Sequence, residues 1–482
     1  MIAFLAGAAT VLAFSPVGFY PLAVLTFALL VHLCADAAPR RAFWTGYAFG
    51  LGLFGAGVSW VYVSLHTFGA MPLPLAAFAT ILFCAFLALF PAAATWLQAR
   101  IPASRAVRAC LLIPAAWVLF EWLRSWIFTG FPWLSAGYAA VGWPVQGYAP
   151  LLGVFGLSFI TLSLAGLAWL LFRQRSLSLL AAIIAVLAGG EALRHVEWTQ
   201  RAGDPVSAAL LQGNIQQDLK FRPERYQAIL ETYARLTEAS KARLIVLPET
   251  AIPGMLNNVD PDYLARLEAA ARRNGGDLLL GAPLRGRTGE FFNSVISLGT
   301  SPRQAYYKSH LVPFGEFFPY GSRWVLNILN MPLADFSRGG AEQAPIDAAG
   351  QRIAINICYE DAFGDEIARR LPEATLLINV SNVAWFGDSL APAQHLQIAR
   401  LRAVETGRMH LAATNTGITA SIDRDGRVLA RLPQFVEGKL EVAAQGYSGT
   451  TPYARLRDWP AVVASLLVLA FAAFIARRAL TR

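Results

Sequence analysis

The ten residues RIAINICYED, 352–361, are the stretch on which the fold and the chemistry of this chain depend. Its three isoleucines alternate with other residues, which is the period-2 pattern of a β-strand. Cys358 follows where this strand is predicted to end, and Glu360, Asp361 and a predicted helix over 363–371 come next. A strand–turn–helix junction can hold a side chain on a rigid base, near backbone N–H groups. Cys358 is therefore a candidate nucleophile, although a free cysteine taken alone is more often a small buried apolar residue.

The composition indicates a membrane protein with more than one domain. The chain has 482 residues, of which 56% are hydrophobic and only 15% are charged. This proportion is too apolar for an ordinary soluble protein, and the length exceeds that of a usual single domain. Much of the net charge of +9 comes from arginine clusters beside apolar segments, where basic residues orient membrane helices. No basic stretch is interleaved with aromatic residues, so we expect no nucleic-acid partner.

Eight apolar segments are predicted to span a membrane. The loops between them alternate between loops with arginines and loops without Lys or Arg, which predicts alternating cytoplasmic and outer sides. Both termini are then cytoplasmic, and the large segment 194–458 lies on the outer face. The predicted spans are 1–15, 20–35, 42–65, 73–98, 107–124, 149–172, 177–193 and 459–476.

These patterns predict a helical membrane domain over 1–193, a catalytic domain over 194–450, and a last membrane helix with its tail over 451–482. Short β-rich runs alternate with helical runs in the middle domain, which favours an α/β layered fold. The sequence contains neither a GxGxxG fingerprint nor a P-loop, so no nucleotide cofactor is expected. No Cys or His spacing indicates a metal site.

The loop GFPWLSAGYAAVGWP, 130–144, allows two interpretations. It is an aromatic belt at the membrane surface, which its composition favours, or a reentrant segment that shapes a lipid-facing mouth. Glu121 and Arg124 precede it, three residues apart on one predicted helix. They are predicted either to pair with each other or to contact a lipid headgroup.

Three stretches of the middle domain, including the end of the one quoted first, bring reactive side chains to predicted strand ends, where loops commonly form sites. A cysteine nucleophile needs a proton acceptor and a group that stabilises an oxyanion, and Glu249 and Lys308 can supply these roles. Taken singly, each is more simply a solvated carboxylate or a surface lysine. The chain has only four lysines among its 40 basic residues, so a lysine here can reflect a need for a compact ammonium. The stretches are LIVLPET (244–250), YYKSHLVPFGEFFP (306–319) and ICYED (357–361).

The Glu–Lys–Cys order resembles the nitrilase superfamily, and the flanking motifs resemble the apolipoprotein N-acyltransferase family of the bacterial inner membrane. The resemblance covers nearly the whole chain. The motifs are LPETAIPG, KSHLVPFGEFFP, ICYED, NVAWFGDS, GFPW at 130–133 and TPYAR at 451–455.

The resemblance implies an αββα nitrilase-like sandwich in the periplasm, attached to about eight transmembrane helices. It implies transfer of an acyl chain from a membrane phospholipid, with phosphatidylethanolamine as the expected donor. The acceptor is the N-terminal amine of a diacylglyceryl-cysteine apolipoprotein, and the transfer is the last step of lipoprotein maturation. It also implies a multi-pass inner-membrane protein that acts as a monomer without a cofactor or a metal.

Residue by residue, Cys358 matches the nucleophile, Glu249 the general base and Lys308 the oxyanion-stabilising lysine. The chain departs from the family at Phe221, where relatives often have Trp, so the role of this position is left open. Four other residues match positions on which the family depends: Glu316, Tyr359, Glu360 and Trp385. Each also has a simpler interpretation. Glu316 would be a support carboxylate, Tyr359 a packed ring, Glu360 a salt-bridged acid and Trp385 a loop aromatic.

Two other functions compete with acyl transfer. A membrane-tethered nitrilase-type amidase would use the same three residues with water as its second nucleophile. A transporter or receptor would use a catalytically inactive nitrilase-like binding domain. The intact set of Cys358, Glu249 and Lys308 argues against the second alternative. The membrane spans argue against the first, because a soluble amide needs no lipid-facing scaffold.

Overall fold

The computed structural model describes residues 1–317 and 335–480, and the chain divides into two compact units. The first unit contains Met1–Tyr62, Pro74–Glu197 and Arg455–Arg482. The second contains Trp198–Ala454 together with Val63–Leu73, a segment that the sequence analysis placed in the membrane domain. Phe318 and Pro319, at the end of the motif that begins at Lys308, lie outside the described residues, as does Arg482.

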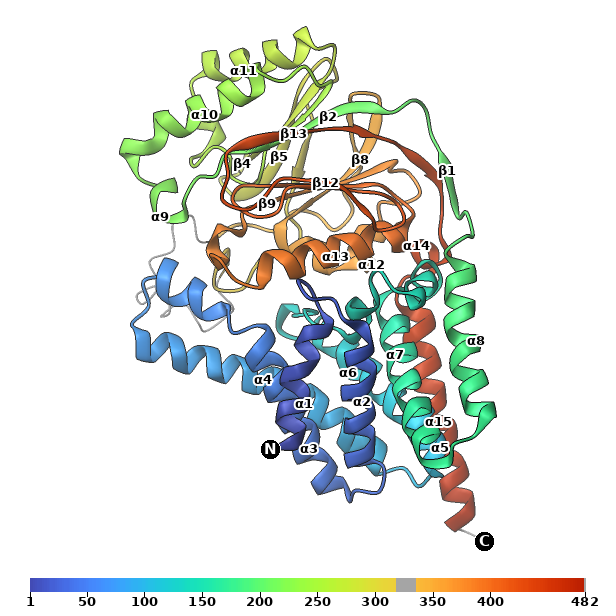
Figure 1. Cartoon of the computed structure of the whole chain (residues 1–482). Coiled ribbons are helices and arrows are strands. Elements are labelled where there is room, and N and C mark those ends of the chain that lie inside the picture. Colours follow the sequence, from blue (N-terminus) through green and yellow to red (C-terminus); the bar gives the residue numbers. More distant parts are fainter. Residues whose placement is uncertain (318–334, 481–482) are drawn as a thin grey trace. The chain divides into compact units, whose positions relative to one another are not determined.

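The first unit is helical, and its helices begin and end close to the apolar segments predicted from the sequence (Figure 1). Within the part of the chain that the structure describes, four helical stretches are long and apolar enough to cross a membrane: Leu73–Ala99, Arg105–Arg124, Pro144–Gln174 and Trp459–Arg478. The chain is thus a membrane protein by the length and composition of these stretches. The main helices are α1 (Ile2–Thr10), α2 (Tyr20–Cys34), α3 (Pro39–Gly57), α4 (Leu73–Ala99), α5 (Arg105–Val107), α6 (Ile113–Arg124), α7 (Ala149–Gln174), α8 (Leu177–Leu193) and α15 (Trp459–Leu480).

Helices α1 and α3 approach each other closely because glycines lie at their contact. A Cβ atom on Gly7 would lie 1.9 Å from the carbonyl oxygen of Phe49, and one on Gly52 would lie 1.9 Å from that of Phe4. Any larger side chain would therefore push the two backbones apart. Small residues at such contacts are typical of helices that pack within a membrane.

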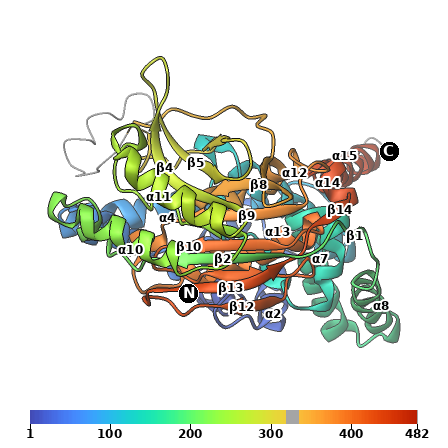
Figure 2. The same cartoon turned by 90° about the horizontal axis from the view of Figure 1, so that it is seen from above.

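The second unit contains two six-stranded sheets stacked face to face (Figures 1 and 2). One sheet has the order β13-β2-β3-β4-β5-β6 and the other β12-β11-β10-β9-β8-β7. A separate two-stranded sheet pairs β1 (Thr199–Arg201) with β14 (Tyr447–Gly449). The strands of the first sheet are β2 (Val206–Gln212), β3 (Leu244–Val246), β4 (Asp277–Arg285), β5 (Phe291–Gly299), β6 (Ala305–Tyr307) and β13 (Gly438–Ala444). Those of the second are β7 (Ile346–Ala348), β8 (Gln351–Ile357), β9 (Leu376–Ser381), β10 (His410–Thr414), β11 (Ala420–Ile422) and β12 (Val428–Arg431).

Side chains of β8 alternate between two cores, one on each face of the second sheet. Ile353, Ile355 and Ile357 belong to the central core between the two sheets. Ala354 belongs to a separate core on the outer face, beside Ile367 and Leu371. The period-2 pattern of RIAINI therefore turns its isoleucines toward the opposite sheet, as a half-buried strand requires.

Helices cover the outer face of each sheet, which makes the second unit an αββα sandwich and confirms the predicted α/β nitrilase-like class. Side chains of α10 and α11 share one core with β2, β3 and β4, and α11 lies over β4 in Figure 2. α12 and α13 pack on the second sheet. The helices of this unit are α9 (Gln217–Lys220), α10 (Tyr226–Glu238), α11 (Pro261–Arg273), α12 (Gly364–Ala368) and α13 (Ala391–Thr406). α14 (Pro452–Leu456) begins in this unit and ends in the first.

Helix α12 is shorter than the predicted helix over 363–371. A 3-10 turn, Cys358–Ala362, occupies the residues directly after β8, and α12 ends at Ala368. Leu371 precedes Pro372, whose ring disfavours helical backbone at the residue before it. The segment from Cys358 to Pro372 is therefore a series of short turns rather than one continuous helix.

Candidate active site

Three strands deliver the three predicted catalytic residues to one edge of the sandwich, two from the first sheet that run in the same direction and one from the second sheet. Glu249 follows β3, Lys308 follows β6, and Cys358 follows β8. β3 is parallel to β4, and β6 runs the same way because both β4–β5 and β5–β6 are antiparallel. Like-directed strands bring their carboxyl ends to one edge, where loops can form a site.

Each of the three stretches contains a non-glycine residue with left-handed backbone. The φ angle is +51° at Thr250, +61° at Phe314 and +53° at Cys358. Such residues cost free energy and are found where surrounding structure holds a sharp turn, often at functional sites. The backbone thus turns sharply at Cys358 itself, directly after β8.

Four side chains form a buried polar cluster at this edge. Lys308 Nζ lies 2.9 Å from Glu316 Oε1 and 3.4 Å from Glu249 Oε1. The amide of Asn293 bridges the two acids, since its Nδ2 donates to Glu249 Oε1 at 2.7 Å and to Glu316 Oε1 at 2.8 Å. The Lys308 side chain is 1% exposed. Neither Glu249 nor Lys308 is thus the solvated surface group that each resembled when taken singly.

Backbone groups hold both carboxylates in place. The N–H of Asn382 donates to Glu249 Oε2 at 2.8 Å, and the N–H of Val312 donates to Glu316 Oε2 at 2.8 Å. The N–H of Lys308 donates to the carbonyl of Asn293 at 2.8 Å. The side chains of the cluster are therefore oriented by bonds that do not depend on a ligand.

The pKa shifts of Glu249 and Lys308 favour the charged form of each, so the two form an ion pair. Burial raises the pKa of Glu249, but Lys308, Asn293 and the N–H of Asn382 outweigh burial and hold the pKa below its ordinary value. Burial lowers the pKa of Lys308, but Glu316 and Glu249 outweigh it and hold this pKa above its ordinary value. At neutral pH Glu249 is therefore an ionised carboxylate and Lys308 an ammonium.

The thiol of Cys358 is half-buried next to this cluster. Burial raises its pKa, and Glu249 raises it further, whereas Lys308 lowers it, so that the pKa lies well above its ordinary value. Cys358 is therefore a neutral thiol at rest. Any reaction in which its sulfur attacks would require the loss of this proton to a nearby acceptor, because the thiolate is the reactive form of a cysteine.

Glu360 accepts hydrogen bonds from backbone groups of two segments of the site. Its Oε1 accepts from the backbone N–H groups of Ser309 at 2.7 Å and His310 at 3.0 Å, and its Oε2 accepts from that of Ile357 at 2.7 Å. One carboxylate thereby ties the residue before Cys358 to the residues after Lys308. Tyr306 also donates its hydroxyl to Glu360, at 3.0 Å. Glu360 thus connects the end of β8 to the loop that follows Lys308.

The rings of Tyr359 and Trp385 each pack against another aromatic ring. The ring of Tyr359 is half-buried and lies edge-on to Phe363, with centroids 5.1 Å apart. The carbonyl of Trp385 accepts from Ser64 Oγ at 2.7 Å, and its ring lies 6.3 Å from that of Phe68. The segment Val63–Leu73 therefore contacts the NVAWFGDS motif within the second unit.

Sequence reasoning missed Asn293 and Asn382 and gave no role to Lys220. Asn293 lies inside β5, where an amide among apolar residues was the only available signal. Asn382 belongs to the NVAWFGDS motif, but its backbone rather than its side chain holds Glu249. Lys220 was visible as one of only four lysines. Phe221, which follows it directly, is half-buried, and its role stays open.

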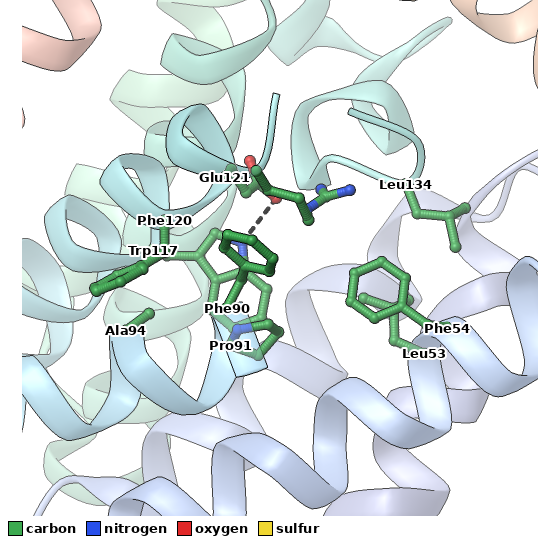
Figure 3. Close-up of a pocket in the computed structure, with 10 residues that line it drawn as sticks. Leu53, Phe54, Phe90, Pro91, Ala94, Trp117, Phe120, Glu121 and Leu134 are labelled. Atoms are coloured by element: carbon green, nitrogen blue, oxygen red, sulfur yellow. Dashed lines mark hydrogen bonds between the residues drawn. The ribbon is translucent and has the colours of Figure 1, made fainter. Parts of the chain in front are cut away.

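The first unit contains a second pair of buried charged side chains, Glu121 and Arg124, beside a pocket lined by Trp117, Phe54 and Leu134 (Figure 3). Glu121 Oε1 accepts from Trp117 Nε1 and from the N–H of Ala136, both at 2.8 Å.

Arg124 donates to the carbonyls of Phe131 and Trp133, the latter at 2.7 Å, and to Ser135 Oγ at 3.3 Å. Trp133 is buried, as is Tyr138 further along the loop. Glu121 and Arg124 therefore hold the GFPW loop packed inside the helical unit, whereas rings of an aromatic belt would lie at its surface.

Comparisons with known proteins agree with this description. Residues 6–167 match the family model of the apolipoprotein N-acyltransferase N-terminal domain, and residues 207–453 match the carbon-nitrogen hydrolase model. The chain is 48% identical to an apolipoprotein N-acyltransferase of Nitrosomonas europaea, over 99% of this chain and 98% of that protein. It is 47% identical to one of Methylococcus capsulatus, over 93% of this chain and 91% of that protein.

Among solved structures, the second unit is similar to the C. elegans NitFhit protein, with a TM-score of 0.40 and 18% identity over 54% of this chain and 65% of that one. It is also similar to an amidase of the nitrilase superfamily from Nesterenkonia AN1, with a TM-score of 0.37 and 20% identity over 54% of this chain and 96% of that one.

The αββα unit with its Glu–Lys–Cys edge defines a carbon-nitrogen hydrolase domain attached to a membrane unit. The chain belongs to the apolipoprotein N-acyltransferase family, and it is an N-acyltransferase.

Proposed function

We propose that the chain transfers an acyl chain from a membrane phospholipid to the N-terminal amine of a diacylglyceryl-cysteine apolipoprotein, through a thioester on Cys358. The observation that carries this proposal is the buried Glu249–Lys308–Glu316 cluster beside the Cys358 thiol. The cluster pairs a carboxylate that is ionised at neutral pH with an ammonium that stays charged. These are the proton acceptor and the oxyanion partner that a cysteine nucleophile needs.

In the first half-reaction, Cys358 gives its proton to Glu249 as its sulfur attacks the ester carbonyl of the phospholipid. Negative charge then develops on the carbonyl oxygen, where Lys308 and nearby backbone N–H groups stabilise it. The carbon–oxygen bond to the glycerol breaks, and the leaving oxygen takes the proton back from Glu249. The products are a lysophospholipid and an acyl thioester on Cys358.

In the second half-reaction, the α-amine of the apolipoprotein attacks the thioester carbonyl. A free α-amine has a pKa of about 7.7–8.0, so it must enter neutral and lose a further proton during attack. Glu249 accepts this proton and returns it to the sulfur as the carbon–sulfur bond breaks. The products are an amide on the apolipoprotein and the original thiol, so each acyl transfer restores the site.

The membrane unit fits lipid substrates. Pulling an acyl chain into water costs about 0.8 kcal/mol per CH₂ group, so an enzyme with two acylated substrates gains from working at the bilayer. We propose eight spans, cytoplasmic termini and a catalytic domain over 194–450 on the periplasmic face of the inner membrane. This topology is supported by the alternation of arginine-rich loops with loops that lack Lys and Arg. We also propose phosphatidylethanolamine as the donor and a monomeric enzyme.

The acyl-enzyme is the direct test of the mechanism. Purified protein incubated with phospholipid alone is expected to gain the mass of one acyl chain on Cys358, and hydroxylamine should remove it. Adding diacylglyceryl-cysteine peptide should discharge the thioester and form an amide. Full-rate transfer by Cys358→Ala would exclude this mechanism. Rapid hydrolysis of the thioester, with no transfer to the amine, would favour the amidase alternative.

Topology is tested separately with reporters. A reporter fused after Arg482 is expected to be cytoplasmic, and one inserted near Gly289 periplasmic. Two reporters on the same side of the membrane would contradict the eight-span arrangement.

A further inference from the structure

The proposed mechanism assigns no role to Arg370, a buried arginine in the turn that follows α12. Its side chain belongs to a residue that is only 7% exposed. Its Nη2 donates to the hydroxyl of Tyr306 at 2.7 Å, and its Nη1 donates to the carbonyl of Ile355 in β8. The guanidinium also lies over the ring of Tyr306, with Cζ 4.6 Å from the ring centroid. A buried charge is costly unless it is paired, so the presence of an arginine here requires an explanation.

The hydroxyl of Tyr306 connects Arg370 to the carboxylate of Glu360. It donates to both carboxylate oxygens, at 3.0 Å each, while it accepts from Arg370. Glu360 is 1% exposed, so water does not compensate its charge. A charged donor polarises the hydroxyl and strengthens the bond that the hydroxyl donates in turn. The guanidinium therefore acts on Glu360 through one intervening side chain.

The hydrogen bonds that the described residues make to the Glu360 carboxylate all come from donors. Besides the Tyr306 hydroxyl, these donors are the backbone N–H groups of Ser309, His310 and Ile357. An ionised carboxylate only accepts hydrogen bonds, whereas a protonated one carries an O–H that must donate. Protonation of Glu360 would therefore weaken the connection between the end of β8 and the loop that follows Lys308.

We propose that Arg370, acting through Tyr306, keeps Glu360 ionised, and that the ionised carboxylate holds the two backbone segments next to Lys308 and Cys358 in place for acyl transfer. Arg370 reaches the site only through Tyr306 and Glu360, so it is a positioning residue. No proton moves to or from Glu360 during the reaction. This inference rests on the proposed function, because it takes Lys308 and Cys358 as the groups that are positioned.

The other cation that acts on Glu360 is already paired. Lys308 contacts two other carboxylates, at 2.9 and 3.4 Å. The ring of His310 lies 2.9 Å from the carboxylate of Glu366. Arg370 is therefore the cation that the hydrogen bonds connect to Glu360. The titratable and charged side chains of the segments around Glu360 are Tyr306, Lys308, His310, Cys358, Tyr359, Asp361, Glu366 and Arg370.

Arg370 determines the direction of the expected pH dependence. Burial raises the pKa of Glu360 above its ordinary value, and Arg370 opposes this rise because it favours the ionised form. Without Arg370 the pKa would rise further, so that Glu360 would take up its proton at a higher pH as the solution is acidified. The bonds from the backbone N–H groups would then be lost on the acidic side and kept at alkaline pH. A side chain that only fills space would have the same effect at every pH.

Arg369 provides a matched control. It precedes Arg370 directly, but its side chain is 39% exposed and pairs with Asp365 at 3.1 Å. Arg369→Met removes the same charge at the neighbouring position, so an effect confined to Arg370→Met reports the bond to Tyr306 rather than the net charge. Arg370→Lys keeps the positive charge and a donor, and it should retain most of the function of the arginine.

The test measures hydrogen exchange at the backbone N–H groups of Ser309, His310 and Ile357, which needs neither lipid nor lipoprotein. Full-length protein in detergent is exchanged between pH 5.5 and 9, the peptides are analysed by mass spectrometry, and each rate is divided by the intrinsic rate at that pH. At pH 6, Arg370→Met is expected to lose about tenfold of the protection at these positions, as is typical when a hydrogen bond to a charged group is lost.

The pH profile and the control variants separate positioning by charge from packing. The loss of protection in Arg370→Met should shrink toward pH 9, and Arg369→Met should match the unsubstituted protein. In a Glu360→Gln background, which cannot titrate, Arg370→Met should add no pH-dependent loss. With phospholipid and lipoprotein peptide, kcat of Arg370→Met should fall about tenfold at pH 6 while KM stays within about twofold, since the positioned groups act on the reacting atoms.

Unchanged protection in folded Arg370→Met, or a loss that is equal at every pH, would overturn the inference. If that variant does not fold, protein labelled with ¹³C at the glutamate carboxyl provides the second measurement. The resonance that disappears in Glu360→Gln should be that of an ionised carboxylate at pH 7 and should titrate at higher pH in Tyr306→Phe. A protonated Glu360 at pH 7, or an unchanged titration in Tyr306→Phe, would also overturn the inference. A pH-dependent loss of protection in a protein that fails to acylate lipoprotein would support the link from Arg370 to Glu360 while contradicting the proposed function.

Discussion

The two units each bury an acidic and a basic side chain, but the partners of these groups differ. In the first unit, Glu121 and Arg124 bond to backbone groups of the GFPW loop. In the second, Glu249 and Lys308 contact each other and a second carboxylate beside a thiol. Charges that bind backbone groups hold a loop in place, whereas charges that bind one another next to a nucleophile can move a proton. The partner of a buried charge therefore indicates its role better than its burial does.

The largest effect is expected from removing the proton acceptor. Glu249→Gln keeps the shape of the side chain, including an oxygen that can still accept a hydrogen bond. We expect acyl transfer to fall by about 10²–10⁴-fold, since this is the typical contribution of a positioned acid–base group. The measurement is the rate of thioester formation with phospholipid, and unchanged thermal unfolding serves as the control. Near-normal transfer would mean that Glu249 has a purely structural role. The buried acids of the two units would then not differ in function.

A stability effect is expected at the pair in the first unit. Arg124→Gln leaves the buried carbonyls of Phe131 and Trp133 without their charged donor, and such losses cost about 3 kcal/mol. The unfolding temperature in detergent should fall, while alkylation of Cys358 by iodoacetamide keeps its rate. Loss of Cys358 reactivity without loss of stability would show that the two regions do not divide their roles in this way.

Asp361, another buried acid of the second unit, tests how pH acts on such groups. Asp361 Oδ1 lies 3.0 Å from His410 Nε2, and Oδ2 lies 3.4 Å from His395 Nε2. Burial raises the pKa of Asp361, but the two histidines outweigh burial and hold it far below its ordinary value. A depressed folded-state pKa adds stability that is present above the unfolded pKa of about 3.9 and is lost as pH falls toward the folded value.

Asp361→Asn should therefore lower the free energy of unfolding by about 2 kcal/mol at pH 6. The difference from the unsubstituted protein should shrink as pH falls below about 4, as measured by chemical denaturation at each pH. A difference that stays constant down to acidic pH would mean that the charge of Asp361 does not stabilise the fold.

The smallest effect is expected at exposed charges, which set the baseline for the comparison. Arg266 of α11 bonds to Glu231 and Glu238 of α10, at 2.7 and 2.6 Å, on the surface of the second unit. Water and salt screen exposed pairs, so Arg266→Gln should lower the unfolding temperature only slightly and leave acyl transfer unchanged. A loss as large as that of Arg124→Gln would show that burial does not separate these classes of charge.

Much of the second unit could be predicted from local patterns. The alternation in RIAINI predicted β8, and apolar runs predicted β2 and β9, because a half-buried or buried strand constrains its own side chains. Strand ends also predicted where Glu249, Lys308 and Cys358 would lie. The edge strand β13 was missed, and its residues are only partly buried, so its sequence is less constrained.

The sequence by itself determined the two-part organisation, the helical membrane unit, the α/β class and the strand-end positions of the three reactive residues. Each of these follows from the period or length of an apolar pattern within a single segment. Only the tertiary structure decided which groups meet. Asn293 bridges Glu249 and Glu316 through its side-chain amide. The backbone N–H of Asn382, 133 residues further along the chain, donates to the Glu249 carboxylate. Lys220 donates a hydrogen bond to the backbone carbonyl of Glu249. These contacts depend on sheet register and on the stacking of two sheets, so no single segment of the sequence contains the information that specifies them.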